Sequence, residues 1–239
     1  MNENAKNLVS TEEKNDSQIR KFWSKVVKFL KWFKEEFIKF PLFILFHPLK
    51  GWDEFKREKR GKMSVAIWFV IFVIFLSIME YQYSGFIVKQ VEVTDLKMLA
   101  EIAYIIAPVV LVTVANWSIT TLFDGKGKMK EIFMMICYSL QPFIVINFLY
   151  DLLSNFLTTD EAQFLTLIKI VAITLLCLMA FMGFVVIHEY GIFKTIGSIL
   201  LTALALCIIV FIALLIFDLS QQIYGFIYSI YKEIATRFL

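Results

Sequence analysis

The chain has 239 residues, of which 59% are hydrophobic and 19% are charged. A soluble domain is about 45–50% apolar and about 25% charged, so this composition excludes an ordinary soluble protein and predicts a multi-pass protein of the cell membrane. The formal net charge is only +3, but residues 1–62 carry a net charge of +6 and the rest of the chain −3. These two parts are therefore expected to meet different environments.

Residues 1–18 are polar and are expected to form a disordered tail, because they have too little apolar surface to offset the entropy of ordering. Between Ile19 and Phe40, apolar residues recur at three- and four-residue steps with lysines beside them, which predicts an amphipathic helix within a basic segment, residues 19–62. Pro41 is expected to end or kink this helix. We expect it to lie in the headgroup region of the membrane, with contacts through Phe22, Phe29, Phe33, Lys21, Lys25 and Lys28. The alternative is that it packs on the ends of the chain's own spans.

Residues 63–217 are expected to form a domain of five membrane-spanning helices. Polar stretches divide this apolar sequence into segments 63–78, 96–117, 132–149, 164–187 and 196–217. Each approaches the ~20 residues that a ~30 Å hydrocarbon core requires, and none alternates as barrel strands do. Residues 218–239 carry another apolar stripe, which predicts a short amphipathic interfacial helix. The predicted fold class is all-α, a polytopic membrane protein with five transmembrane helices and an amphipathic helix at each end.

The charges of the loops predict the orientation. With a cytoplasmic N-terminus, the segments on the inner side hold 19 Lys and Arg residues and those on the outer side hold 4. Because cytoplasmic loops are enriched in Lys and Arg, the N-terminus is expected in the cytoplasm and, with five spans, the C-terminus outside the cell.

Ionisable residues at the outer ends of the spans form the first candidate site. Such residues are costly in a membrane unless they are paired or hydrated, so we expect a polar outer cluster containing an ion pair between Lys169 and Glu101. The alternative is that these residues lie at the water interface, with the Lys169 side chain reaching the surface. The cluster is predicted to contain Glu80, Glu101, Asp151, Lys169 and Asp218.

The third span contains a second candidate, a polar and proline-containing motif. Pro142 removes a backbone donor and is expected to kink the helix beside Tyr138, Ser139 and Gln141. This motif is either a ligand site or, more commonly for such residues, a place where helices pack through hydrogen bonds. The glycine-lysine loop at residues 124–130 lacks the P-loop pattern, so we expect it to touch anionic headgroups rather than a nucleotide.

No catalytic or metal-binding constellation is found in the sequence. The three cysteines lie inside apolar segments without a CxxC pattern, and only Glu189 is adjacent to either of the two histidines, His47 and His188. Motifs that place a nucleophile beside a base are absent as well. The sequence therefore predicts no enzymatic activity, no cofactor and no metal.

Several short motifs in chain order resemble the bacterial branch of the Yip-domain family, whose eukaryotic members are Golgi proteins that interact with Ypt and Rab GTPases. The resemblance covers about residues 41–217 and is carried by His47-Pro48, Gly51-Trp52, the basic run at 56–62, Asn116-Trp117, Asp124-Gly125-Lys126-Gly127, and Tyr138-Ser139-Leu140-Gln141-Pro142. It implies five helices, a cytoplasmic N-terminus and no catalytic residue. The DLxGP-type segment of the eukaryotic members is not present.

We therefore hypothesise a non-enzymatic membrane scaffold or accessory subunit that binds partner membrane proteins. The resemblance implies a role beside an ABC transporter or in envelope defence. The alternatives are a small transporter or channel that uses the outer polar cluster, and a protein that shapes membranes through its N-terminal helix. The expected partners are a lipid bilayer with anionic headgroups and a membrane protein; a homo-oligomer stays open, and no nucleic acid is expected.

Overall fold

A computed structural model describes residues 23–28, 30–83, 98–157 and 161–238, and these residues form helices joined by short loops, without strands. The all-α prediction is therefore confirmed. The chain divides into two compact units, Met1–Gly51 and Trp52–Leu239, which we describe separately. The predicted disordered tail, residues 1–18, lies outside the described residues.

The first unit is a helical segment that passes through a proline. Helical residues 23–28 and 30–33 lead into a π-helical stretch, η1 (Lys34–Lys39), and then into α2 (Phe40–Phe46). Pro41, which was expected to end or kink the helix, does not end it, because it lies in the first turn of α2. The Phe40 N–H bonds to the carbonyl of Glu35, five residues back, so the widened turn accommodates the proline ring. The helix ends at His47, before α3 (Pro48–Arg57), which continues into the second unit.

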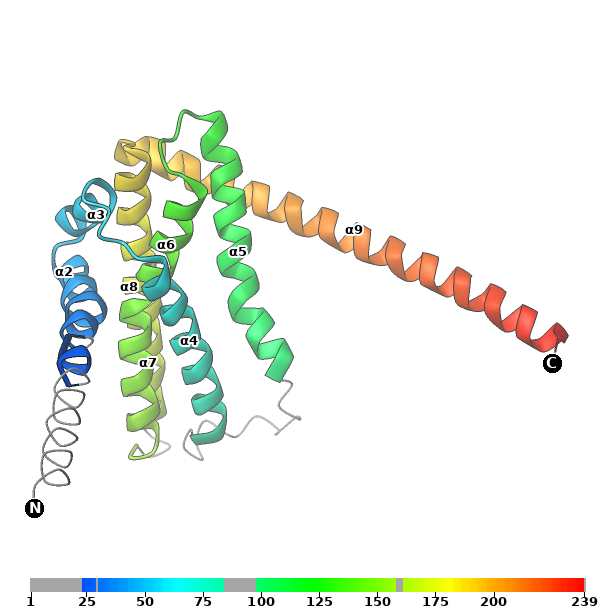
Figure 1. Cartoon of the computed structure of the whole chain (residues 1–239), viewed down its shortest axis with the longest axis horizontal. Helices are drawn as coiled ribbons and strands as arrows, with labels where there is room; N and C mark the ends of the chain where they lie inside the picture. The colour runs from blue at the N-terminus through cyan, green and yellow to red at the C-terminus, as the bar shows by residue number, and fades with distance from the viewer. Residues whose placement is uncertain (1–22, 29, 84–97, 158–160, 239) are drawn as a thin grey trace, which may run out of the picture. The chain divides into compact units, whose positions relative to one another are not determined.

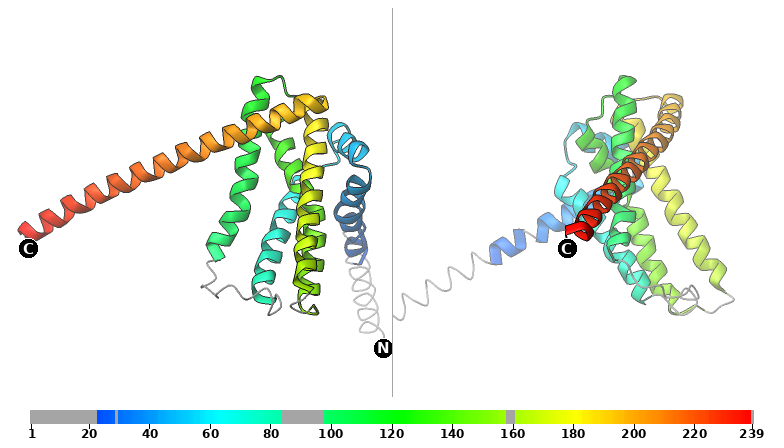
Figure 2. Two further views of the ribbon diagram at one scale, coloured as in Figure 1. Left: turned by 180° about the vertical axis from the view of Figure 1, so that it is seen from behind. Right: turned by 90° about the vertical axis from the view of Figure 1, so that its right-hand side faces the viewer.

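The second unit contains α4 (Met63–Tyr83), α5 (Met98–Leu122), α6 (Met129–Ser139), α7 (Gln141–Ser154), α8 (Ala162–His188) and α9 (Ile192–Phe238). Figures 1 and 2 show α4 to α8 side by side, running up and down. Five described segments are long and apolar enough to cross a membrane: Met63–Glu80, Met98–Leu122, Met129–Ser154, Gln163–His188 and Ile192–Ile234. The prediction of five spans is thus confirmed.

The third span lies at the centre of this unit. Its first half, α6, contacts α4, α5 and α8, while its second half, α7, contacts α4 and α8. The two halves separate at Leu140, directly before Gln141 and Pro142, where the sequence predicts a kink. This central position agrees with the third span being the least apolar and the most buried of the five.

The last helix, α9, differs from the prediction. We expected a fifth span at 196–217 and then a separate short helix, but one helix of 47 residues extends from Ile192 to Phe238. At 1.5 Å per residue it is about 70 Å long, more than twice the thickness of a hydrocarbon core. Residues 218–222, which follow the predicted fifth span, include no proline or glycine and are compatible with a continuous helix.

We call the end of the second unit where α4 begins and α8 ends the basic end, and the opposite end the far end. At the basic end, Tyr138 forms edge-to-face contacts with Phe55 and Phe69 at ring-centroid distances of 5.2 and 5.3 Å. The Tyr138 hydroxyl also accepts a hydrogen bond from the Lys62 N–H at 3.2 Å. This tyrosine therefore joins α6 to α4 and to the end of α3.

Candidate functional site

A buried chain of hydrogen bonds joins α5, α8 and α9 at the basic end. Asn116 is completely buried, and its Oδ1 lies 2.9 Å from Nε2 of His188, which is 2% exposed. The Asn116 Nδ2 donates to Oγ1 of Thr202 at 3.1 Å, and that hydroxyl donates to the Ser198 carbonyl at 2.7 Å. Since the amide oxygen accepts, Nε2 of His188 must carry the proton in the neutral ring. These bonds make the three residues a packing element between helices.

The glycine-lysine loop covers the His188 ring. A Cβ atom added to Gly125 would lie 2.9 Å from Nδ1 of His188, and one added to Gly127 would lie 2.7 Å from Cγ2 of Ile187. The Tyr190 hydroxyl donates to the Phe123 carbonyl at 2.8 Å and fixes the start of this loop. The glycines are therefore required by close approach to α8, and the loop is a cover for His188.

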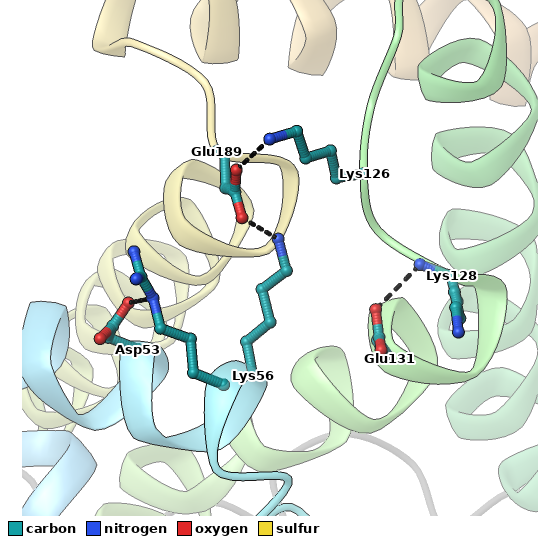
Figure 3. A network of polar contacts seen from close by, with 7 residues as sticks. Asp53, Lys56, Lys126, Lys128, Glu131 and Glu189 are labelled. Carbon is teal, nitrogen blue, oxygen red and sulfur yellow. Dashed lines mark hydrogen bonds and ion pairs between the residues drawn. The ribbon is translucent and has the colours of Figure 1, made fainter.

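Glu189 connects this loop to α3 (Figure 3). Its carboxylate accepts from Nζ of Lys126 at 2.5 Å and from Nζ of Lys56 at 2.9 Å. The residue ends α8 in the left-handed conformation, with φ 55° and ψ 38°. Hydrogen bonds from Lys126 and Lys56 lower the pKa of the Glu189 carboxyl to about 2. One carboxylate between two cations therefore connects the end of α8 to α3 and to the glycine-lysine loop.

At the far end, the predicted residues Glu80, Asp151 and Lys169 lie on neighbouring helices. The partner of Lys169 differs from the predicted one. The Lys169 ammonium forms its ion pair with Glu80 of α4, and not the expected pair with Glu101. It also lies 4.4 Å from the centre of the Tyr150 ring. The Glu101 carboxylate instead accepts from the Ser77 hydroxyl at 3.2 Å, which joins α5 to α4.

The two remaining acidic residues of the predicted cluster, Asp151 and Asp218, differ in burial and in hydrogen bonding. Both carboxylate oxygens of Asp151 are buried and have no hydrogen-bond partner among the described residues. Asp218 does not join this cluster, because it is exposed on α9 and bonds to Nε2 of Gln222 on the same helix at 2.8 Å. The cluster at the far end thus consists of Glu80, Asp151 and Lys169, with Glu101 beside it on Ser77.

The residues of the predicted kink motif are all buried. Ser139 donates to the Met135 carbonyl of its own helix at 2.9 Å, and Tyr138 packs as described above. Gln141 and Pro142 begin α7, and Oε1 of Gln141 has no partner in the described part of the chain. This motif is consistent with a packing element.

The predicted membrane-surface residues belong to the first unit. Lys25 and Lys28 are exposed, whereas Phe33 is half-buried and stacks on Phe37 at 4.5 Å between ring centres. Lys21, Phe22 and Phe29 lie outside the described residues. The surface role of this helix stays a prediction.

Sequence reasoning missed some residues of both clusters. Asn147, Tyr150 and Ser77 were not connected with the far end, and the pairing of His188 with Asn116 was not foreseen. A usable signal was present for one of them, since Asn147, Asp151 and Ser154 follow each other at four- and three-residue steps and so share one face of a helix. The pairing of His188 with Asn116 has no such signal, because 72 residues separate the two.

The fold defines a polytopic helical membrane protein with two polar clusters inside its bundle. A family model described as the Yip1 domain matches residues 42–231, and the chain belongs to this family. No curated protein and no solved structure matches the chain.

Proposed function

We propose that this protein is a non-enzymatic membrane scaffold or accessory subunit that binds a partner membrane protein. The observation that supports this proposal is the distal part of α9, defined as residues 211–234. All of these side chains are exposed, including Phe211, Phe217, Phe226 and Ile230. Figure 1 shows the same part of α9 leaving the other helices of the second unit.

The length of α9 makes lipid an incomplete cover for this surface. A hydrocarbon core accommodates about 20 residues of helix, whereas the candidate span in α9, Ile192–Ile234, covers 43 residues, with polar residues between 218 and 222. Apolar side chains beyond the hydrocarbon need another apolar surface, because their exposure to water costs about 25 cal/mol per Å². Large exposed apolar patches commonly mark binding sites for proteins or membranes. A helix of a partner protein would supply this surface.

The polar residues of the basic end support a structural role. Asn116 and Thr202 are engaged in bonds between helices, and Glu189 is engaged with two lysines. Groups committed in this way are poor candidates for binding a substrate. The proposal therefore assigns the basic end to rigidity and the distal part of α9 to association.

The proposal includes an orientation and a finer role. The basic end and the N-terminal helix face the cytoplasm, where exposed Lys25, Lys28, Lys128 and Lys130 meet anionic headgroups. The finer role, beside an ABC transporter or in envelope defence of a bacterium, rests on the sequence resemblance alone. A homo-oligomer is one outcome that the following experiment separates.

The test is co-purification of the full chain at native expression in a mild detergent. The double variant Phe226→Ser/Ile230→Ser should lose the partner while its thermal stability stays unchanged, because both side chains are exposed. The matched control Gln221→Ser/Gln222→Ser changes the same exposed part of α9 without removing apolar area. Recovery of the protein alone, or only with itself, would exclude the accessory-subunit role.

The second candidate is a small transporter or channel, and it is favoured by the buried carboxylate oxygens of Asp151, which have no hydrogen-bond partner among the described residues. A carrier should lose flux when Lys169 or Asp151 is substituted, while its partners still co-purify. A scaffold should show the opposite pattern, with loss of partners on substitution of α9. Membrane shaping by the N-terminal helix predicts instead that the full chain deforms anionic vesicles in a salt-sensitive way.

A further inference from the structure

Three acceptor atoms at the far end lack the donors that buried oxygens normally have. They are Oδ1 of Asn147 and both carboxylate oxygens of Asp151, each buried and without a hydrogen-bond partner in the described residues. Asn147 is only 6% exposed. Because Asn147 and Asp151 are four residues apart on α7, their side chains are neighbours on one face of the helix. Buried acceptors without donors are rare in proteins and call for a physical explanation.

The charges around these oxygens leave one negative charge uncompensated. Glu80 of α4 and Lys169 of α8 both face Asp151. These two residues form an ion pair with each other. The Tyr150 ring of α7 lies against the same ammonium. Glu101 of α5 is held by Ser77 of α4. An ionised Asp151 would therefore stand beside a pair that is already neutral.

An ionised carboxylate without a donor is costly in the interior of a membrane protein. One positive charge is missing beside the three acceptor atoms, and a single proton supplies that charge together with one hydrogen-bond donor. We propose that Asp151 binds this proton from the solvent and is a neutral carboxylic acid at neutral pH, with its O–H donating to Oδ1 of Asn147. The carboxylate and a proton give the acid, and no other group is consumed.

This site is a proton-binding position inside the bundle, separate from the association surface proposed for α9. Loss of the proton would make Asp151 a carboxylate beside the carboxylate of Glu80, where α4, α7 and α8 meet. The repulsion between these two carboxylates would weaken the contact between α4 and α7. The packing of the far end is thereby linked to the pH on that side of the membrane.

Infrared spectroscopy of the full chain in lipid nanodiscs tests the proposal. The protein at pH 7 should show the band of a protonated carboxyl group that shifts in D₂O, and Asp151→Asn should abolish it. Asn147→Leu should move the band, because the acid loses its acceptor. The control Glu101→Gln removes a carboxyl at the same end whose oxygen is already bonded to Ser77, and it should leave the band intact. Absence of the band from the unmodified protein, or its persistence in Asp151→Asn, would overturn the proposal.

Thermal unfolding separates a bound proton from a bound cation and from an ion pair. Asparagine resembles the neutral acid, so Asp151→Asn should unfold at the same temperature as the unmodified protein at pH 7, and it should no longer lose stability as the pH rises. A clear loss of stability in Asp151→Asn at pH 7 would mean that the charged form is needed. Stabilisation of the unmodified protein by sodium at fixed pH, without the infrared band, would mean that a metal ion occupies the site. Either result contradicts proton binding.

Discussion

Two parts of α9 show how differently one helix can be used. In the first part, Thr195, Ser198 and Thr202 are buried, and Thr202 bonds to Asn116 of α5. In the distal part, residues 211–234, every described side chain is exposed. The first part has the small polar residues that allow helices to approach, whereas the second has large aromatic and aliphatic ones. The comparison indicates that the first part completes the fold and that the second is available to another molecule.

The largest loss of stability is expected at the glycine-lysine loop over His188, where a larger side chain has no space. Gly127→Val should destabilise the protein by about 1–3 kcal/mol, because the new side chain would overlap Ile187 and the His188 ring. The measurement is the unfolding temperature in detergent. Gly197→Ala, in the first part of α9, is the control, since its Cβ would meet nothing within 4 Å. Equal behaviour of the two variants would show that the loop does not pack on α8.

A comparable loss is expected when the bond between α5 and α9 is removed. Asn116→Leu should cost about 1–3 kcal/mol, because it leaves the His188 N–H and the Thr202 hydroxyl without their side-chain partner. Thr121→Ala serves as control, since the hydroxyl of this exposed residue bonds to the Trp117 carbonyl of its own helix. The combined variant Asn116→Leu/His188→Phe should lose less stability than the sum of the single variants, as expected for directly bonded residues.

A similar or smaller loss is expected at the far end. Lys169→Met should lower the unfolding temperature because it leaves the Glu80 carboxylate without its cation. Adding Glu80→Gln to this variant should restore part of the stability, since no unpaired charge then remains. If the double variant is no more stable than Lys169→Met, the ion pair does not contribute as the structure indicates.

The smallest change in stability is expected at the exposed Glu189, and it depends on pH. Its carboxyl has a folded-state pKa of about 2, below the ordinary value of 4.5, so its contribution to stability is complete above about pH 4.5 and is lost as the pH falls toward about 2. Glu189→Gln should flatten the loss of stability in this acid range. Glu58→Gln, a change at another exposed glutamate, should leave the acid profile unaltered. An unaltered profile in Glu189→Gln would show that Lys56 and Lys126 do not hold this carboxylate in solution.

The sequence predicted the elements of the fold better than their contacts. The five spans follow from the length and composition of the apolar segments, which are properties of single helices. The helix divides directly before Gln141 and Pro142, whereas Pro41 does not end its helix, because the π-helical stretch before it accommodates the ring. The continuity of α9 was not predicted, although residues 218–222 are compatible with a helix.

The candidate site could be predicted only in part. Glu80, Asp151 and Lys169 were expected at one end of the spans, since alternating topology brings them to similar depth. The partner of Lys169 depends on how α4, α5 and α8 rotate about their axes, and a single sequence does not contain this information. The same reason explains why the contact between His188 and Asn116 was not foreseen, although each residue lies near the predicted end of its span.

The most direct test of the proposed association is a photo-crosslinking residue placed at position 226 of α9, used in membranes at native expression. The account predicts that this position attaches to one membrane protein in a fixed ratio, because Phe226 is 66% exposed and lies in the distal part of α9. Attachment only to lipid, or only to another copy of the same chain, would contradict the role as an accessory subunit. It would make the proton-binding far end, around Asp151 and Asn147, the principal candidate for function.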